Sequence, residues 1–127
     1  MFVGVPRYEF IDDDRFKVLV EFGFLTDYVR APRYGRFAHY IEEGFESDGP
    51  SIPKWIRWYL NRLDKKVFDA AVVHDWFIAN RKKNGWTRKQ CDLVFKEALE
   101  SRGVSKWKCA ILYNGVRAWA KWNRYDQ

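Results

Sequence analysis

The chain has 127 residues, of which 47% are hydrophobic and 31% charged. This composition is typical of one compact domain and excludes a disordered or collagen-like chain. No apolar run approaches the roughly 20 residues that span a bilayer, and the N-terminal residues lack the pattern of a secretory signal. Because Cys91 and Cys109 are too few for a disulfide scaffold, we expect two reduced core cysteines and a reducing compartment.

Alternating hydrophobic residues predict strands in the first fifty residues. Residues 16–25 alternate with a period of two, and their hydrophobic positions are Phe16, Val18, Val20, Phe22 and Phe24. One more strand is expected over residues 8–11, before an acidic turn at residues 12–14, and another over residues 36–45. We therefore predict an antiparallel sheet of about three strands.

Helical patterns replace this alternation beyond Pro50. Helices are predicted over residues 53–61, from residue 64 to about 82, from 87 to 103 and from 105 to 119. Thr87 and Gln90 have the spacing of a capping box, and Gly85 and Gly103 are expected to end helices. The predicted fold class is α+β. We expect one domain over residues 1–127, with a β-rich part over 1–50 and three to four helices over 51–127.

Polar residues interrupt the most apolar helical patterns. On a helical wheel, one stripe is formed by Val67, Ala70, Ala71, His74 and Ile78, with Asp75 beside it. Asp92 lies at the edge of the apolar stripe of the next predicted helix. A short connection favours antiparallel packing, which would bring the Asp92 carboxylate to the His74 imidazole. Such a carboxylate orients a general base, although a histidine with a satisfied structural role in the core is the alternative.

The segment from Gly44 to Pro53 connects the predicted sheet to the predicted helices. Its glycines and prolines favour turns, which leave backbone carbonyls available next to Asp48. Carbonyl and carboxylate oxygens are the ligands that a hard cation such as calcium takes. A simple Asp-Gly turn is the alternative reading of this segment. The buried position expected for Asp75 likewise requires an ion pair, a hydrogen bond or a cation.

Charge is distributed unevenly along the chain, whose net charge is +6. Residues 1–50 carry 6 basic and 10 acidic residues, whereas residues 51–127 carry 17 basic and 7 acidic residues and all seven tryptophans. Such a basic, aromatic half could contact an anionic membrane, an acidic protein or nucleic acid, although no fingerprint supports nucleic acid. A solvated surface over a core of aromatic residues is the simpler alternative. The candidate partner-binding residues are Lys106, Lys108, Arg117, Trp119, Lys121 and Trp122.

Three motifs resemble those of a family of uncharacterised phage and prophage proteins of about this length. The family pattern combines Gly-Phe-x-(Ser/Thr)-Asp-x-x-Ser-(Ile/Val)-Pro, an apolar helix ending in His-Asp-x-x-Tyr, and a later Asp-x-x-Phe. Here these motifs are residues 44–53, residues 70–78 around His74-Asp75, and residues 92–95. The resemblance covers about residues 36–120. It implies a phage protein located in the host cytoplasm or in the virion.

The helical half also resembles the helical core of secreted phospholipases A2, especially the small bacterial forms. Those enzymes carry His-Asp-x-x-Tyr on one helix and an aspartate on the antiparallel helix about twenty residues later; here His74 and Asp92 are 18 residues apart. The resemblance implies that His74 is the general base and that Asp92 orients it. It further implies that Asp75 binds calcium together with the loop residues Asp48, Gly49 and Ser51, and that calcium polarises the ester carbonyl.

Three functions remain open at this point. Ile78 replaces the tyrosine of the His-Asp-x-x-Tyr motif, and Pro50 removes a backbone donor from the loop. These departures favour a virion or tail-associated structural component that carries a phospholipase-A2-like site, contacting other virion proteins or an anionic membrane. The alternative is an active calcium-dependent hydrolase of phospholipids or similar esters. A protein that binds a host factor is the third possibility.

Overall fold

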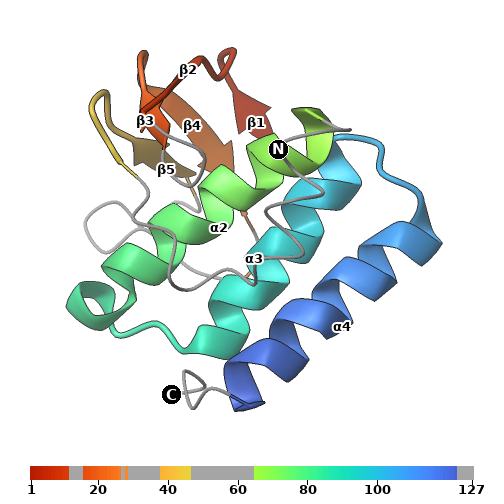
Figure 1. Cartoon of the computed structure of the whole chain (residues 1–127). Coiled ribbons are helices and arrows are strands. Elements are labelled where there is room, and N and C mark those ends of the chain that lie inside the picture. The colour runs from red at the N-terminus through yellow and green to blue at the C-terminus, as the bar shows by residue number, and fades with distance from the viewer. Residues whose placement is uncertain (12–15, 27, 29–37, 47–64, 123–127) are drawn as a thin grey trace.

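Strands and helices are separated both along the chain and in space (Figure 1). The computed structural model describes residues 1–11, 16–26, 28, 38–46 and 65–122. Within these residues the chain forms five strands, followed by three helices. The strands are β1 (Phe2–Val3), β2 (Tyr8–Phe10), β3 (Phe16–Val18), β4 (Phe22–Leu25) and β5 (Ala38–Ile41). The helices are α2 (Lys65–Asn84), α3 (Arg88–Ser101) and α4 (Lys106–Trp122).

The strands form two small antiparallel sheets. One sheet has the order β1-β4-β5, and the other pairs β2 with β3. In the second sheet Tyr8 is opposite Val18 and Phe10 is opposite Phe16, so the strands expected before and after residues 12–14 are antiparallel partners. Antiparallel strands followed by helices confirm the predicted α+β class.

The expectation of one strand over residues 16–25 is wrong. The chain leaves β3 after Val18 and enters β4, in the other sheet, at Phe22. Val20, which the alternation placed with the buried residues, is 48% exposed because it lies in the connection between the two strands. Phe16, Val18, Phe22 and Phe24 are buried as predicted. A period of two therefore identified four of the five expected inward positions and missed the break between the strands.

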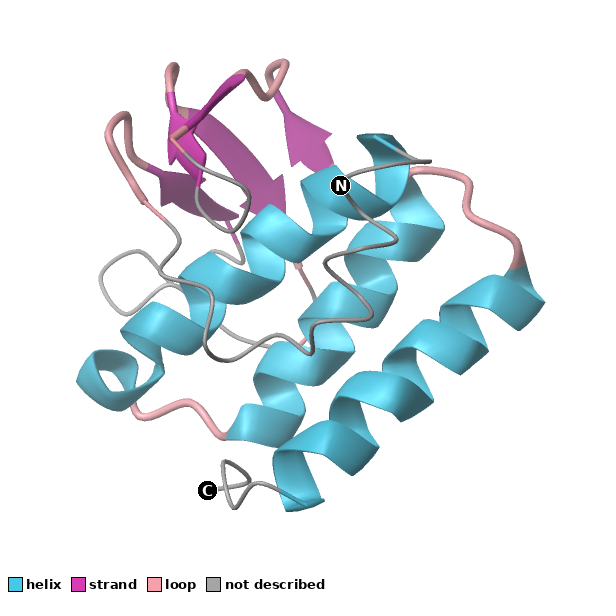
Figure 2. Ribbon diagram, in the orientation of Figure 1, coloured by secondary structure: helices cyan, strands magenta, loops and turns pink. Residues whose placement is uncertain are grey.

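The core extends from the strands through α2 and α3 to α4. Phe68 of α2 contacts the rings of Tyr8 and Phe16, with ring centroids 4.8 and 5.3 Å apart. At the other end of the sheets, the His39 ring lies 4.9 Å from that of Phe77. Helix α3 packs beside α2, and α4 packs beside α3 on the side away from the strands (Figure 2). The order of layers is therefore strands, α2, α3 and α4.

Local signals in the sequence determine the helix ends. The capping box is present, because the Gln90 amide donates to Thr87 Oγ1 at 3.1 Å and the Thr87 amide donates to Gln90 Oε1 at 2.8 Å. Gly85 and Gly103 have φ angles of 72° and 80°, which only glycine adopts readily. The helix predicted over residues 53–61 lies outside the described residues. No helix in the described ranges combines the length and the apolar character needed to span a membrane.

A buried carboxylate connects the strands to two helices. Tyr8 of β2 donates its hydroxyl hydrogen to Asp69 of α2 at 2.7 Å, and Arg102 at the end of α3 pairs with the same carboxylate at 3.2 Å. Burial, followed by the charge of Asp69, raises the pKa of Tyr8. The Arg102 guanidinium also stacks 3.9 Å above the ring of Phe2. These contacts fix β1 and β2, one strand from each sheet, to α2 and to the end of α3.

Replacing Leu99 by alanine is expected to lower the free energy of unfolding by about 2–5 kcal/mol, because the truncation leaves a cavity between packed elements. Leu99 has no exposed surface, whereas Ile111 is 56% exposed. The control Ile111→Ala is therefore expected to change the free energy of unfolding by no more than about 0.5 kcal/mol. Urea denaturation of both variants measures the difference, and equal losses would contradict this core.

Candidate functional site

His74 and Asp92 meet between α2 and α3. A connection of only three residues makes these helices antiparallel neighbours. The His74 Nε2 atom lies 2.6 Å from Asp92 Oδ1, and the two side chains are 1% and 0% exposed. The structure therefore brings together the two residues that the sequence singled out as a general base and its orienting carboxylate. Their catalytic role stays a prediction.

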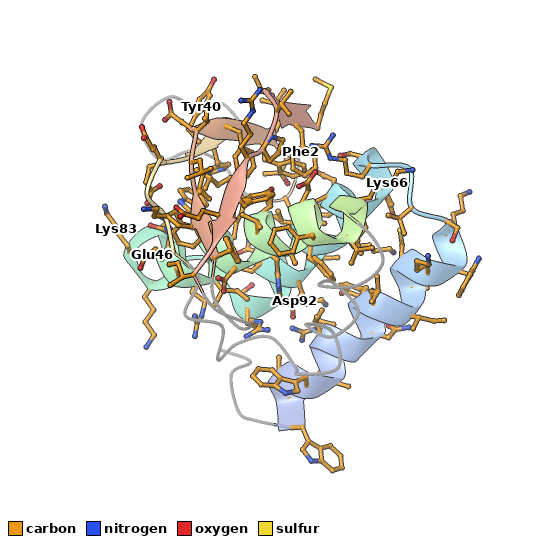
Figure 3. All side chains as sticks on the ribbon, turned by 45° about the horizontal axis from the view of Figure 1, so that its top comes forward. Phe2, Tyr40, Glu46, Lys66, Lys83 and Asp92 are labelled. Carbon is orange, nitrogen blue, oxygen red and sulfur yellow. The ribbon has the colours of Figure 1, made fainter. Side chains whose placement is uncertain are left out.

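Two arginines bind the same carboxylate. Arg88, one helical turn before Asp92 on α3, donates from Nε to Oδ1 at 3.0 Å. Arg117 of α4 donates from a terminal guanidinium nitrogen to Oδ2 at 2.9 Å. Asp92 therefore receives hydrogen bonds from α2, α3 and α4, and it lies among the helices, away from the sheet residue Tyr40 (Figure 3).

Asp92 is held in its ionised form. Burial on its own raises the pKa of a carboxyl group, because it removes water from the charged form. The hydrogen bond from His74, the charge of Arg88 and the hydrogen bond from Arg117 outweigh this effect and lower the pKa of Asp92 to about 2. A carboxylate ionised at neutral pH only accepts hydrogen bonds, so the proton in the contact with His74 is on Nε2.

The second ring nitrogen of His74 is therefore the atom of chemical interest. In a neutral imidazole with its proton on Nε2, Nδ1 keeps a lone pair that can accept a proton. Nδ1 makes no hydrogen bond to any of the described residues. The ring itself is held by Phe95, whose centroid is 4.8 Å away. This arrangement fixes both the orientation and the tautomer of the imidazole.

The predicted calcium ligands are only partly within the described residues. Asp75 is buried beside His74 on α2, whereas Asp48, Gly49 and Ser51 lie outside the described residues. The described part of the chain contains no cluster of three or more histidine, cysteine or acidic side chains suited to a metal ion. Asp92 already accepts hydrogen bonds from three side chains. The described residues therefore do not by themselves fit a calcium ion.

The predicted partner-binding residues divide into two groups. Lys106, Lys121 and Trp122 are exposed, and Lys108 is partly exposed. Arg117 corrects the expectation of a surface residue: its side chain is only 13% exposed because its guanidinium pairs with Asp92. Trp119 is also partly covered, with the Arg88 guanidinium 6.0 Å from its ring centroid.

Sequence reasoning missed Arg88 and Arg117 as members of the site. Arginine is rarely fully buried unless it is paired, and Arg88 has no exposed surface. The spacing of four residues between Arg88 and Asp92 is a signal that could have identified this pair. Arg117 lies 25 residues from Asp92, and no local pattern links the two.

Acid titration tests the Asp92 network. Because the folded-state pKa of Asp92 is depressed, its ionic contribution to stability is present above about pH 4 and is lost as the pH falls toward about 2. The contribution is about 2 kcal/mol. Asp92→Asn is expected to remove this dependence and to lower stability at pH 7 by about 3–5 kcal/mol, because two buried guanidinium groups lose their anion.

Urea denaturation at a series of pH values measures both effects. The control is Glu43→Gln, a substitution of an exposed carboxylate, which should keep the stability profile of the unmodified chain. An Asp92→Asn variant whose stability falls with acid as steeply as that of the unmodified chain would contradict the network.

Comparisons with known proteins concern the same region. A family model described as "Protein of unknown function (DUF1353)" matches residues 35–116, which is more than half of the chain. The match includes His74, Arg88 and Asp92 and ends just before Arg117. No curated protein and no solved structure matches the chain. The chain belongs to the DUF1353 family.

Proposed function

We propose that this protein is a hydrolase in which His74 activates a water molecule for attack on an ester. The observation that supports this proposal is the 2.6 Å contact between His74 Nε2 and the ionised Asp92 carboxylate. That contact leaves the Nδ1 lone pair of a neutral imidazole available as a base. A histidine oriented by a buried carboxylate is a recurring arrangement for general-base catalysis.

The proposed reaction uses groups of this chain and water. Nδ1 takes a proton from water as the water oxygen bonds to the ester carbonyl carbon, and Asp92 stabilises the imidazolium that forms. Cleavage of the ester carbon–oxygen bond then releases an acid and an alcohol, and the alcohol oxygen receives the proton from His74. Arg88 and Arg117 act as positioning residues, because they hold the Asp92 carboxylate in place.

Calcium and a phospholipid substrate are further parts of the proposal and rest on the resemblance to phospholipases A2. Of the four predicted calcium ligands, only Asp75 lies in the described part of the chain. No step of the proposed reaction passes through a metal ion. The calcium requirement and the substrate are therefore results to be measured.

A virion or tail-associated structural role is the second candidate. It is favoured by the way that α2, α3 and α4 each contribute a side chain to one buried charge, since such a connection also serves a protein without catalysis. The phage origin on which this candidate depends is itself inferred from sequence motifs. A virion component would be recovered from purified particles in a fixed stoichiometry.

Replacing His74 by glutamine is expected to lower kcat/KM for ester hydrolysis by at least about 100-fold, because the amide cannot accept the proton. The chain offers a matched control in its other histidine. His39 is also buried, with its ring 5.2 Å from that of Trp86, so His39→Gln perturbs packing without touching Asp92. We expect that control to retain activity within a few-fold.

The substrates are anionic phospholipid vesicles, assayed by fatty-acid release, and a water-soluble ester, each with calcium and with a chelator. Circular dichroism verifies that both variants are folded. Hydrolysis of neither substrate by the unmodified chain would contradict the hydrolase and leave the structural role. Equal activity of His74→Gln and the unmodified chain would contradict the role of His74.

A further inference from the structure

Helix α4 presents an apolar stripe to solvent. Its inward face packs toward α3 through four buried residues, Cys109, Leu112, Val116 and Ala120. On the opposite face, Trp107, Ile111 and Trp122 are 65%, 56% and 87% exposed. We call these three residues the α4 stripe. Their spacing of four and eleven residues places them on one side of a helix. Among the described helices, α4 lies farthest from the strands (Figure 2).

Exposure of these side chains is costly without a partner. Burying a large apolar side chain is among the most favourable contributions to folding and association, and tryptophan is usually largely buried. The α4 stripe extends from Trp107 to Trp122, a separation of 15 residues or about 22 Å along the helix. Because the three residues are aligned rather than scattered, they indicate an extended contact surface.

The charge of α4 restricts the nature of the partner. The helix contains four basic residues, Lys106, Lys108, Arg117 and Lys121, and no acidic residue. Arg117 is directed to Asp92, which leaves the three lysines near the α4 stripe. Lys106 and Lys121 are exposed, and the Lys108 ammonium lies 5.9 Å from the Trp107 ring centroid. A second copy of this face would bring like charges together, whereas an anionic surface would complement them.

We propose that α4 lies in the interface of an anionic lipid bilayer, with the α4 stripe at the level of the headgroups and acyl chains. Helices that bind in this way combine tryptophan and aliphatic residues on one face with lysines that reach the phosphates. Indole rings favour that interface because they are apolar with one polar group. Because α4 is already folded against α3, binding requires no folding of the helix.

Docking by α4 would also bring the buried site close to the bilayer. Arg117, on the side of α4 that faces the protein, binds Asp92, which in turn binds His74. The docking proposal does not depend on the hydrolase, because it rests on the exposure and charge of α4 alone. Binding and catalysis can therefore fail independently.

Vesicle flotation of the full chain tests the proposal. The probes are vesicles of phosphatidylcholine alone and of phosphatidylcholine mixed with phosphatidylglycerol. The unmodified chain is expected to float with the mixed vesicles only, and the double substitution Trp107→Ala with Trp122→Ala is expected to lower partitioning at least tenfold. Lys106→Gln with Lys121→Gln is expected to lower it roughly tenfold at low salt.

Two control variants make the same kinds of substitution at exposed residues outside α4. Tyr40→Ala removes an exposed aromatic ring from β5, and Lys82→Gln with Lys83→Gln removes two exposed charges from the end of α2. Both controls should float as well as the unmodified chain. The proposal is overturned if the unmodified chain fails to float with the mixed vesicles, or if the controls lose as much partitioning as the α4 variants.

The same set of proteins tests whether the α4 stripe is a surface for self-association. Size-exclusion chromatography of the unmodified chain should give a monomer. A dimer that the tryptophan substitutions convert to a monomer would assign the α4 stripe to contact between copies and would overturn the membrane proposal.

Discussion

The ionised carboxylate of Asp92, buried between three helices, is the interaction on which the rest of the structure depends. A buried charge is tolerated only when opposite charges and hydrogen bonds replace the lost water. His74, Arg88 and Arg117 supply these groups from α2, α3 and α4. Because each of them reaches the same carboxylate, the position of α4 is connected to the orientation of the imidazole on α2. The contacts that hold the three helices together are therefore also the contacts that orient the proposed general base.

The strands and the helices contribute to this arrangement in different ways. The strands cover α2 and are fixed to it through Tyr8 and Asp69, which pairs with Arg102 at the end of α3. The described side chains that bind Asp92 all come from helices. Helix α4 closes the far side of α3 and directs Trp107 and Trp122 outward. The His74–Asp92 site and the α4 stripe thus lie on opposite sides of α4.

Sequence patterns predicted the structural features that depend on residues close together in the chain. The capping box of Thr87, the glycine that ends each of α2 and α3, and the inward positions of the strands follow from local rules. The contact between His74 and Asp92 was also predictable, because a short connection makes the helices antiparallel. The division of residues 16–25 between two sheets and the burial of Arg117 depend on contacts distant in sequence, which a single sequence does not reveal.

The central claim is that His74 donates its Nε2 proton to Asp92 and keeps Nδ1 as a proton acceptor. Nitrogen-15 NMR of the histidine rings at neutral pH tests it most directly, with His74→Gln providing the assignment. We predict the tautomer of the His74 ring with its proton on Nε2, hydrogen-bonded to Asp92, and replacement of Asp92 by asparagine should alter that signal. A His74 ring with its proton on Nδ1 would contradict both the hydrogen bond and the proposed base.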